Sequence, residues 1–144
     1  MRIDGDWLPC DDGVVRPLIV GTVLARDGSW RRMEFLVDTG ADRTVLTADI
    51  LQDLDLVASP TTGTVVGLGG EVGSLEVNTE IALPCRGSGR ALFRGSISAI
   101  IDSDALDMSV LGRDITGLFS VIVDRPGAVV CLIGQRHRYS IEQI

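Results

Sequence analysis

The residues of this sequence best suited to chemistry are the carboxylate, hydroxyl and glycine of Asp38-Thr39-Gly40. They follow directly on an apolar run, Met33–Val37. A carboxylate at the end of a buried strand is costly, and proteins keep such groups mostly where they serve a reaction. It can activate water as a general base or deliver a proton as a general acid. Alone the motif is weak, because a strand followed by Asp and Gly also describes an ordinary turn.

Two further glycine-containing segments lie downstream of this motif. Val65–Val72 has the pattern of a hairpin with a glycine-rich tip, and Ser109–Ile115 that of a buried strand entering a short helix. Glycines at a hairpin tip allow it to close over a ligand and exclude water, although a plain glycine-rich turn has the same composition. The predicted tip residues are Val66, Gly67, Leu68, Gly69 and Gly70.

The three segments, in this order, resemble the retroviral-type aspartic proteases, or retropepsins, from about Val14 to Ile133. The resemblance implies an all-β, single-domain acid protease barrel with one or two short helices that acts as a homodimer. In that family one Asp-Thr-Gly loop, one flap and one Gly-Arg-Asp turn make half of an endopeptidase. This chain of 144 residues holds a single Asp-Thr-Gly loop, so two copies are needed to bring two Asp38 side chains together.

The resemblance assigns Asp38 to catalysis and gives its neighbours supporting roles. Two Asp38 carboxylates at close range cannot both ionise cheaply, so they share a proton and supply a base and an acid from identical groups. Thr39 is expected to bond across the dimer axis and fix the active-site loop, and Gly40 to admit the substrate backbone. Ala41 stands where pepsin-like enzymes often carry a hydroxyl. With one donor fewer, we expect a weakly acidic pH optimum, higher than that of pepsin.

Charged residues beside the motif complete the expected site. The resemblance implies a partly buried, bidentate ion pair between Asp42 and Arg113 that joins the loop to the start of the helix. A structural role for Arg113 is favoured over a catalytic one, and Arg43 should alter the charge preference of the pocket that it borders. The predicted substrate-binding residues are Gly40, Ala41, Asp42, Arg43, Val66, Gly67, Leu68, Gly69 and Gly70.

Composition favours a β fold and argues against several functional classes. The hydrophobic fraction is 45%, aromatics make up 4%, and 17 glycines punctuate short apolar runs. A net charge of −7 argues against nucleic acid as a partner. No run is long enough to span a membrane, and Met1–Cys10 lacks the features of a signal peptide, so we expect no membrane partner and a cytoplasmic location. All 13 basic residues are Arg, which suggests a GC-rich bacterial genome.

Neither a metal nor a cofactor is expected. Cys10, Cys85 and Cys131 are widely spaced and are interpreted as reduced, structural residues. His137 is the only histidine, and the acidic loop Asp102–Asp107 lacks the central glycine and closing glutamate of a calcium loop.

Short strands and turns are predicted to position the motif. A hairpin of Gly13–Ala25 and Trp30–Val37 delivers Asp38, and Thr47 is expected to cap a helix over Ala48–Leu54. The other predicted elements are strands at Leu75–Leu83 and Ala91–Ile101, a short helix at Arg113–Leu118, and a last hairpin of Phe119–Val123 and Ala128–Ile133.

Residues 13–134 are expected to form the protease domain, with 1–12 as an N-terminal segment and 135–144 as a tail or dimer-interface strand. Either Val129–Ile133 or Tyr139–Ile144 could supply an interface strand. Two other interpretations stay open: a catalytically silent peptide-binding or assembly module of the same fold, and a β-barrel with chance motif matches. The physiological substrate, and any self-processing of the N-terminal segment, are open as well.

Overall fold

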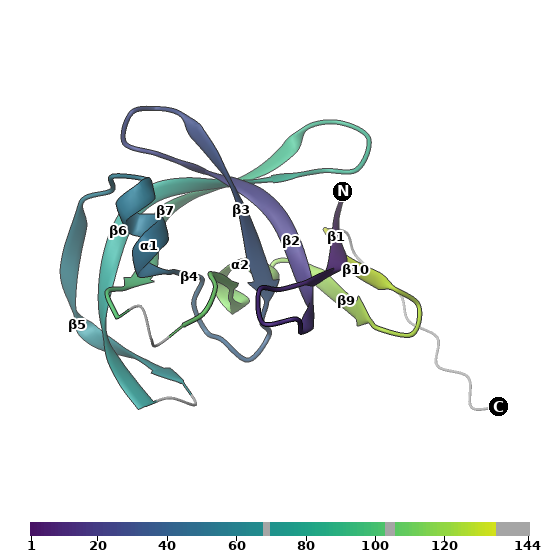
Figure 1. The fold of residues 1–144 in the computed structure, drawn as a ribbon. Coiled ribbons are helices and arrows are strands. Elements are labelled where there is room, and N and C mark those ends of the chain that lie inside the picture. The colour runs from purple at the N-terminus through teal and green to yellow at the C-terminus, as the bar shows by residue number, and fades with distance from the viewer. Residues whose placement is uncertain (68–69, 103–105, 135–144) are drawn as a thin grey trace.

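The computed structural model describes residues 1–67, 70–102 and 106–134. The described chain is built mainly of strands, with two short helices, α1 (Ala48–Asp53) and α2 (Arg113–Thr116) (Figure 1). The all-β prediction is therefore confirmed. The strands are β1 (Arg2–Pro9), β2 (Val15–Leu24), β3 (Trp30–Val37), β4 (Val45–Leu46), β5 (Ala58–Gly67), β6 (Gly70–Pro84), β7 (Arg90–Ile100), β8 (Val110–Leu111), β9 (Ser120–Asp124) and β10 (Val129–Ile133).

The strands form a 10-stranded sheet in the order β5-β6-β7-β4-β8-β3-β2-β1-β10-β9. An additional pairing of β6 with β2, in the register Thr22↔Ala82, closes part of this sheet into the predicted barrel. The closure leaves little space at Gly21, where an added Cβ would lie 3.0 Å from the Ala82 carbonyl oxygen and 2.7 Å from Leu83 Cδ2. A larger residue there would force these neighbours to move.

The strand that leads to Asp38 is held on both sides. As predicted, β3 forms an antiparallel hairpin with β2, and its last residues pair in parallel with β8 in the registers Leu36↔Val110 and Val37↔Leu111. Its inward side chains, including the fully buried Phe35, lie in the main core. That core is mostly aliphatic, as the composition indicates. Because β3 is paired on both sides and its inward side chains are buried, the next residue, Asp38, has a fixed position.

The N-terminal strand was not predicted from the sequence. Residues 1–12 contain β1, which pairs with β10 through Arg2↔Ile133 and with β2 through Trp7↔Pro17. Among the residues of β1 only Ile3 is fully buried, so the strand has no clear apolar pattern. One of its partners, β10, is distant in the sequence, and the other, β2, follows after a turn. β-Propensity depends strongly on such context, so the local pattern was insufficient.

The last hairpin, β9 and β10, was predicted, but it corrects one expectation. β10 lies between β1 and β9, so both edges of Val129–Ile133 are already paired within the chain. It cannot serve as an interface strand without giving up one of those ladders. The other candidate, Tyr139–Ile144, lies outside the described residues.

Helix α1 also differs from its prediction. It ends at Asp53, and although Thr47 occupies the N-cap position, its hydroxyl makes no capping bond within the described chain. The Thr47 backbone N–H instead donates to the hydroxyl oxygen of Ser109, at 3.2 Å. Thr47 therefore joins α1 to the segment before β8. No helix of the described ranges is long and apolar enough to cross a membrane.

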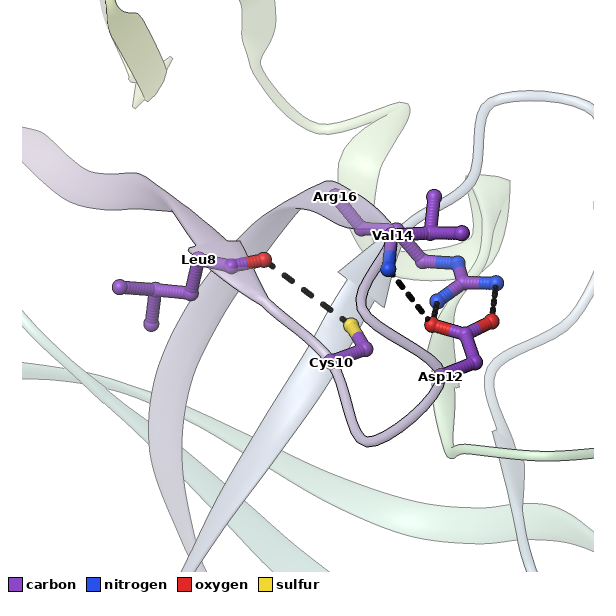
Figure 2. A network of polar contacts seen from close by, with 5 residues as sticks. All are labelled: Leu8, Cys10, Asp12, Val14 and Arg16. Atoms are coloured by element: carbon purple, nitrogen blue, oxygen red, sulfur yellow. Dashed lines mark hydrogen bonds and ion pairs between the residues drawn. The ribbon is translucent and has the colours of Figure 1, made fainter.

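The turn between β1 and β2 is stabilised by an ion pair (Figure 2). Asp12 accepts hydrogen bonds from Arg16 Nη1 at 2.8 Å and Nη2 at 2.6 Å, and from the Val14 backbone N–H at 2.9 Å. The Arg16 guanidinium, and secondly the Val14 N–H, lower the pKa of Asp12 to about 2. The folded state thus favours the ionised carboxylate.

This pKa shift predicts an acid-sensitive contribution to stability. Because the pKa of Asp12 is lower in the folded chain than its ordinary 3.8, the contribution is present above about pH 4 and is lost as pH falls toward 2. We expect Asp12→Asn to be less stable than wild type at pH 6, with the difference shrinking as pH falls below about 4 and mostly lost by about pH 2. Urea denaturation at stepped pH measures this. The control Asp53→Asn, at an exposed carboxylate of α1, should not show this convergence.

Candidate active site

Asp38 lies immediately after β3, and its carboxylate is held from one side. Its backbone N–H donates to the Leu111 carbonyl at 3.2 Å, which ties it to β8. Its Oδ1 accepts hydrogen bonds from the backbone N–H groups of Gly40 at 2.9 Å and Ala41 at 3.2 Å. Within the described chain Oδ2 accepts no bond. The half-buried side chain therefore keeps a fixed orientation and offers one oxygen to water or to another acid.

The two residues after Asp38 leave its carboxylate accessible. Thr39 and Gly40 are both exposed in the single chain. An added Cβ at Gly40 would lie 3.2 Å from Asp38 Oδ1, a distance that forces one of the two atoms to move. Gly40 therefore keeps its own backbone close to the carboxylate without obstructing it. Ala41 lacks a side-chain donor, and its contribution to the Asp38 carboxylate is its backbone N–H.

A buried hydrogen-bond network joins the Asp38 loop to α2, and sequence reasoning missed it. The Thr44 side chain is fully buried, and its hydroxyl donates to Asp114 Oδ1 at 2.7 Å while accepting the Gly112 N–H at 3.1 Å. The Asp114 carboxylate also accepts the Thr44 backbone N–H, at 2.9 and 3.0 Å. A threonine at the start of an apolar run, followed much later by Asp at a helix start, carries too little information to predict this pairing.

The same network requires a glycine at position 112. An added Cβ there would lie 2.3 Å from the carbonyl carbon and oxygen of Arg43 and 2.7 Å from the Thr44 nitrogen. These are backbone atoms, which cannot move aside as a flexible side chain would. The active-site loop and the turn before α2 are therefore in direct backbone contact.

Asp42 and Arg113 are brought together, although differently from expectation. The Arg113 guanidinium contacts Asp42 Oδ1 through one Nη2 atom, and the two side chains are 58% and 79% exposed. The expected partial burial and bidentate geometry are absent from the single chain. The backbone makes the stronger connection, because Arg113 N–H donates to the Ala41 carbonyl at 2.8 Å and Asp114 N–H to the Asp42 carbonyl at 3.2 Å.

The predicted flap is a hairpin of β5 and β6. The described backbone pairs Val66 with Glu71 and Gly67 with Gly70, while Leu68 and Gly69 lie outside the described residues. Arg43 reaches toward this hairpin, where its Nη2 lies 3.3 Å from Glu76 Oε1 of β6. The two side chains are 56% and 39% exposed, so the ion pair is weakly stabilising and easily exchanged.

The described chain also contains a cavity of about 840 Å³, but Asp38 does not line it. Its walls come from the β1–β2 turn, β3, the start of α1 and residues 106–109. This cavity is therefore not the space in front of the Asp38 carboxylate. Among the described residues, no group of three or more His, Cys, Asp or Glu is arranged to hold a metal ion, and His137 lies outside them.

Comparison with known proteins places these observations in a family. Residues 22–115 match the family model described as Aspartyl protease. EIAV protease complexed with the inhibitor HBY-793 is 25% identical, with a TM-score of 0.50 over 71% of this chain and 86% of that one. A retropepsin-like aspartic protease from Rickettsia conorii is 19% identical, with a TM-score of 0.54, and the match covers 92% of this chain and 97% of that one. At this identity the similarity is one of fold alone. No curated protein matches the sequence.

The close backbone contact at Gly112 predicts a large effect of a small substitution. Gly112→Ala must separate the Asp38 loop from α2, and we expect a loss of roughly 1 to 3 kcal/mol in the free energy of unfolding, as for overpacking against rigid atoms. Denaturant unfolding measures it. The control Gly73→Ala has nothing within 4 Å of the added methyl group and should change stability by less than about 0.5 kcal/mol. Equal effects of the two substitutions would contradict the contact.

The buried hydroxyl of Thr44 gives a second prediction. Thr44→Val keeps the shape but leaves the Asp114 carboxylate and the Gly112 N–H without that partner, so we expect a loss of about 1 to 3 kcal/mol in unfolding free energy. Thr44→Ser keeps the hydroxyl and should recover most of it. If Thr44→Val were as stable as Thr44→Ser in the same unfolding assay, the network would not hold the loop.

Proposed function

Because this chain belongs to the aspartyl protease family and has a retropepsin-like fold, we propose that it is a homodimeric endopeptidase with a dyad of two Asp38 residues. The observation that carries the proposal is the geometry of Asp38. One carboxylate oxygen is fixed by two backbone N–H groups, and the other accepts no bond in the described chain. A second copy placed against that oxygen would create the shared-proton pair that metal-free amide hydrolysis uses.

The dyad would act through one water molecule. One Asp38 carboxylate removes a proton from the water, and the water oxygen attacks the carbonyl carbon of the peptide bond while the protonated Asp38 donates its proton to the carbonyl oxygen. In the resulting diol, the Asp38 that took the proton from water donates it to the amide nitrogen as the C–N bond breaks. The other Asp38 takes a proton from a diol hydroxyl, which forms the carboxylic acid product and restores the pair with one shared proton.

The residues around Asp38 support this proposal in different ways. The Gly40 and Ala41 amides orient both carboxylates in the same manner, and Thr39 is proposed to bond across the dimer axis. An extended peptide would lie between the loop and the β5–β6 hairpin as an added strand, with Asp42 and the hairpin backbone contacting its main chain. The proposed substrate is therefore a peptide or protein segment in an extended conformation.

Arg43 would influence which side chains this site accepts. Its ion pair with Glu76 is exposed and connects the active-site loop with the base of the proposed flap. A substrate carboxylate can replace Glu76 at little cost, because exposed ion pairs contribute only about 0 to 1 kcal/mol. We therefore expect acidic residues to be tolerated in the pocket beside Arg43, and the cleavage of a peptide library measures this preference.

Loss of the Asp38 carboxylate is the direct test of the proposal. With a diverse peptide library, Asp38→Asn should cleave at least about 1,000-fold more slowly than wild type, because an amide can act neither as base nor as shared acid. Wild-type activity should be highest at weakly acidic pH and should fall faster than linearly on dilution, because the site needs two chains. Asp53→Asn, which removes an exposed carboxylate from α1, is the matched control and should keep full activity.

Two results would contradict the proposal. Peptide cleavage that survives Asp38→Asn would assign the chemistry to another group. Folded, dimeric wild-type protein that cleaves no library member would favour the catalytically silent module, in which the same fold binds peptides without hydrolysing them.

A further inference from the structure

The cavity between α1 and the β1–β2 turn is separate from the Asp38 carboxylate and has the size of a ligand site. Its volume of about 840 Å³ lies within the range of roughly 300 to 1,000 Å³ that ligand pockets occupy. Part of its lining is apolar, and the methionines in it can adapt to the shape of a bound group. The apolar lining residues are Pro9, Met33, Ile50, Leu106 and Met108.

The charged lining of this cavity is predominantly acidic. Arg16 is neutralised by its ion pair with Asp12 (Figure 2), and Arg32 Nη2 lies 3.5 Å from Glu34 Oε1. Among the described residues, three further carboxylates line the cavity and have no ion-pair partner: Asp11, Asp49 and Asp107. The apolar lining is therefore flanked by negative charge that the described chain leaves unbalanced.

Thr47 adds a buried polar group without a partner. The residue lines the cavity and is only 5% exposed. Its hydroxyl makes no helix-capping bond, and no other hydrogen bond to it is present in the part of the chain that the structure describes. A buried hydroxyl without a partner is costly and rare in proteins unless a ligand or water supplies the bond. The cavity is the space from which such a partner can reach Thr47.

Ser109, beside Thr47 in the cavity wall, is also buried and also has a proton to donate. Its hydroxyl oxygen accepts the Thr47 backbone N–H at 3.2 Å, whereas its own proton has no acceptor within the described ranges. The Ser109 carbonyl accepts the Leu36 N–H at 3.0 Å, which fixes this wall to β3. Two neighbouring hydroxyl groups on a fixed wall can thus donate to an acceptor in the cavity.

Together these features specify the chemistry of a ligand. The hydroxyl protons require an acceptor such as a peptide carbonyl, the carboxylates require basic groups, and the apolar lining requires aliphatic surface. A metal ion would match only the carboxylates, and no group of three or more His, Cys, Asp or Glu in the described ranges is arranged to hold one. A polyamine has no carbonyl to offer the hydroxyls. An extended peptide with basic and apolar side chains meets all three requirements.

We propose that this cavity is a second binding site of the chain, and that it takes a peptide segment in which apolar and basic side chains alternate. In an extended peptide, successive side chains point to opposite sides, so an apolar residue can lie on the apolar lining while its basic neighbours reach the carboxylates around it. The inference does not rest on the proposed function, because Asp38 does not line this cavity.

Binding of a defined probe tests the charge requirement. The probe is the end-blocked, fluorescein-labelled peptide Leu-Arg-Leu-Arg-Leu-Arg, and its anisotropy is recorded with the Asp38→Asn protein so that the probe stays intact. Adding Asp49→Asn and Asp107→Asn together should weaken binding at least about fivefold, and a probe with Glu in place of Arg should not bind. Asp53→Asn, in the same helix as Asp49 but outside the cavity lining, is the matched control and should leave binding unchanged.

Substitutions of Thr47 test the hydroxyl requirement. Thr47→Val keeps the shape of the side chain and should weaken binding of the probe about three- to tenfold. Its free energy of unfolding should not fall, because the hydroxyl has no partner to lose within the described chain. Thr47→Ser keeps the hydroxyl and should bind as the unsubstituted protein does. A purely structural Thr47 would give the reverse, a less stable Thr47→Val protein that binds the probe normally when folded.

Several results would overturn the inference. They are no binding of the basic probe, equal binding of the acidic probe, or affinities that neither the Thr47→Val nor the paired Asp49→Asn and Asp107→Asn substitutions change. Complete displacement of the probe by an equal concentration of spermidine would also overturn it, because the site would then take a free cation and not a peptide. Binding of the probe without any Asp38-dependent cleavage by wild type would support this site and count against the protease, whereas cleavage without such binding would do the reverse.

Discussion

The buried hydroxyl of Thr44 is the contact on which the rest of the site depends. It bonds at once to the carboxylate at the start of α2 and to the backbone of Gly112, while Gly112 itself lies against the Arg43 backbone. The active-site loop has no regular secondary structure of its own, so its conformation is set by this attachment. Among the described residues, the Asp114 carboxylate accepts hydrogen bonds from Thr44 of the loop and from Ile115 of its own helix, so loop and helix are ordered together.

This attachment explains how one short chain prepares an acid for chemistry. β3 brings Asp38 to the end of a strand paired on both sides, and the turn after it directs two amides at one carboxylate oxygen. Within the described chain the other oxygen accepts no hydrogen bond, so it is available to water, a substrate or a second acid. The fold thus supplies the orientation of the carboxylate that the proposed function requires.

The parts of the molecule that the sequence predicted are those determined locally. The β2–β3 hairpin and the strand–helix turn at Gly112 follow from alternating apolar residues and turn glycines. The parts that it missed depend on distant partners: β1 is recognisable only beside β10, and Thr44 only beside Asp114. The expected burial of the Asp42–Arg113 pair was wrong for a related reason, because the exposure of long charged side chains depends on what covers them, and a single chain leaves them uncovered.

The pairing of β1 with β10 joins residue 2 to residue 133 in one ladder. Contacts between residues so far apart in sequence form slowly, since most of the chain must be ordered before the loop between them closes. During synthesis β1 leaves the ribosome long before β10 exists. Ile3, which is buried in the folded chain, is then still exposed. The barrel half that includes β2 and β3 can fold early, but the edge that ends in β9 is complete only when β10 has arrived. Folding of the described sheet therefore finishes at β10, the strand that joins β9 to β1.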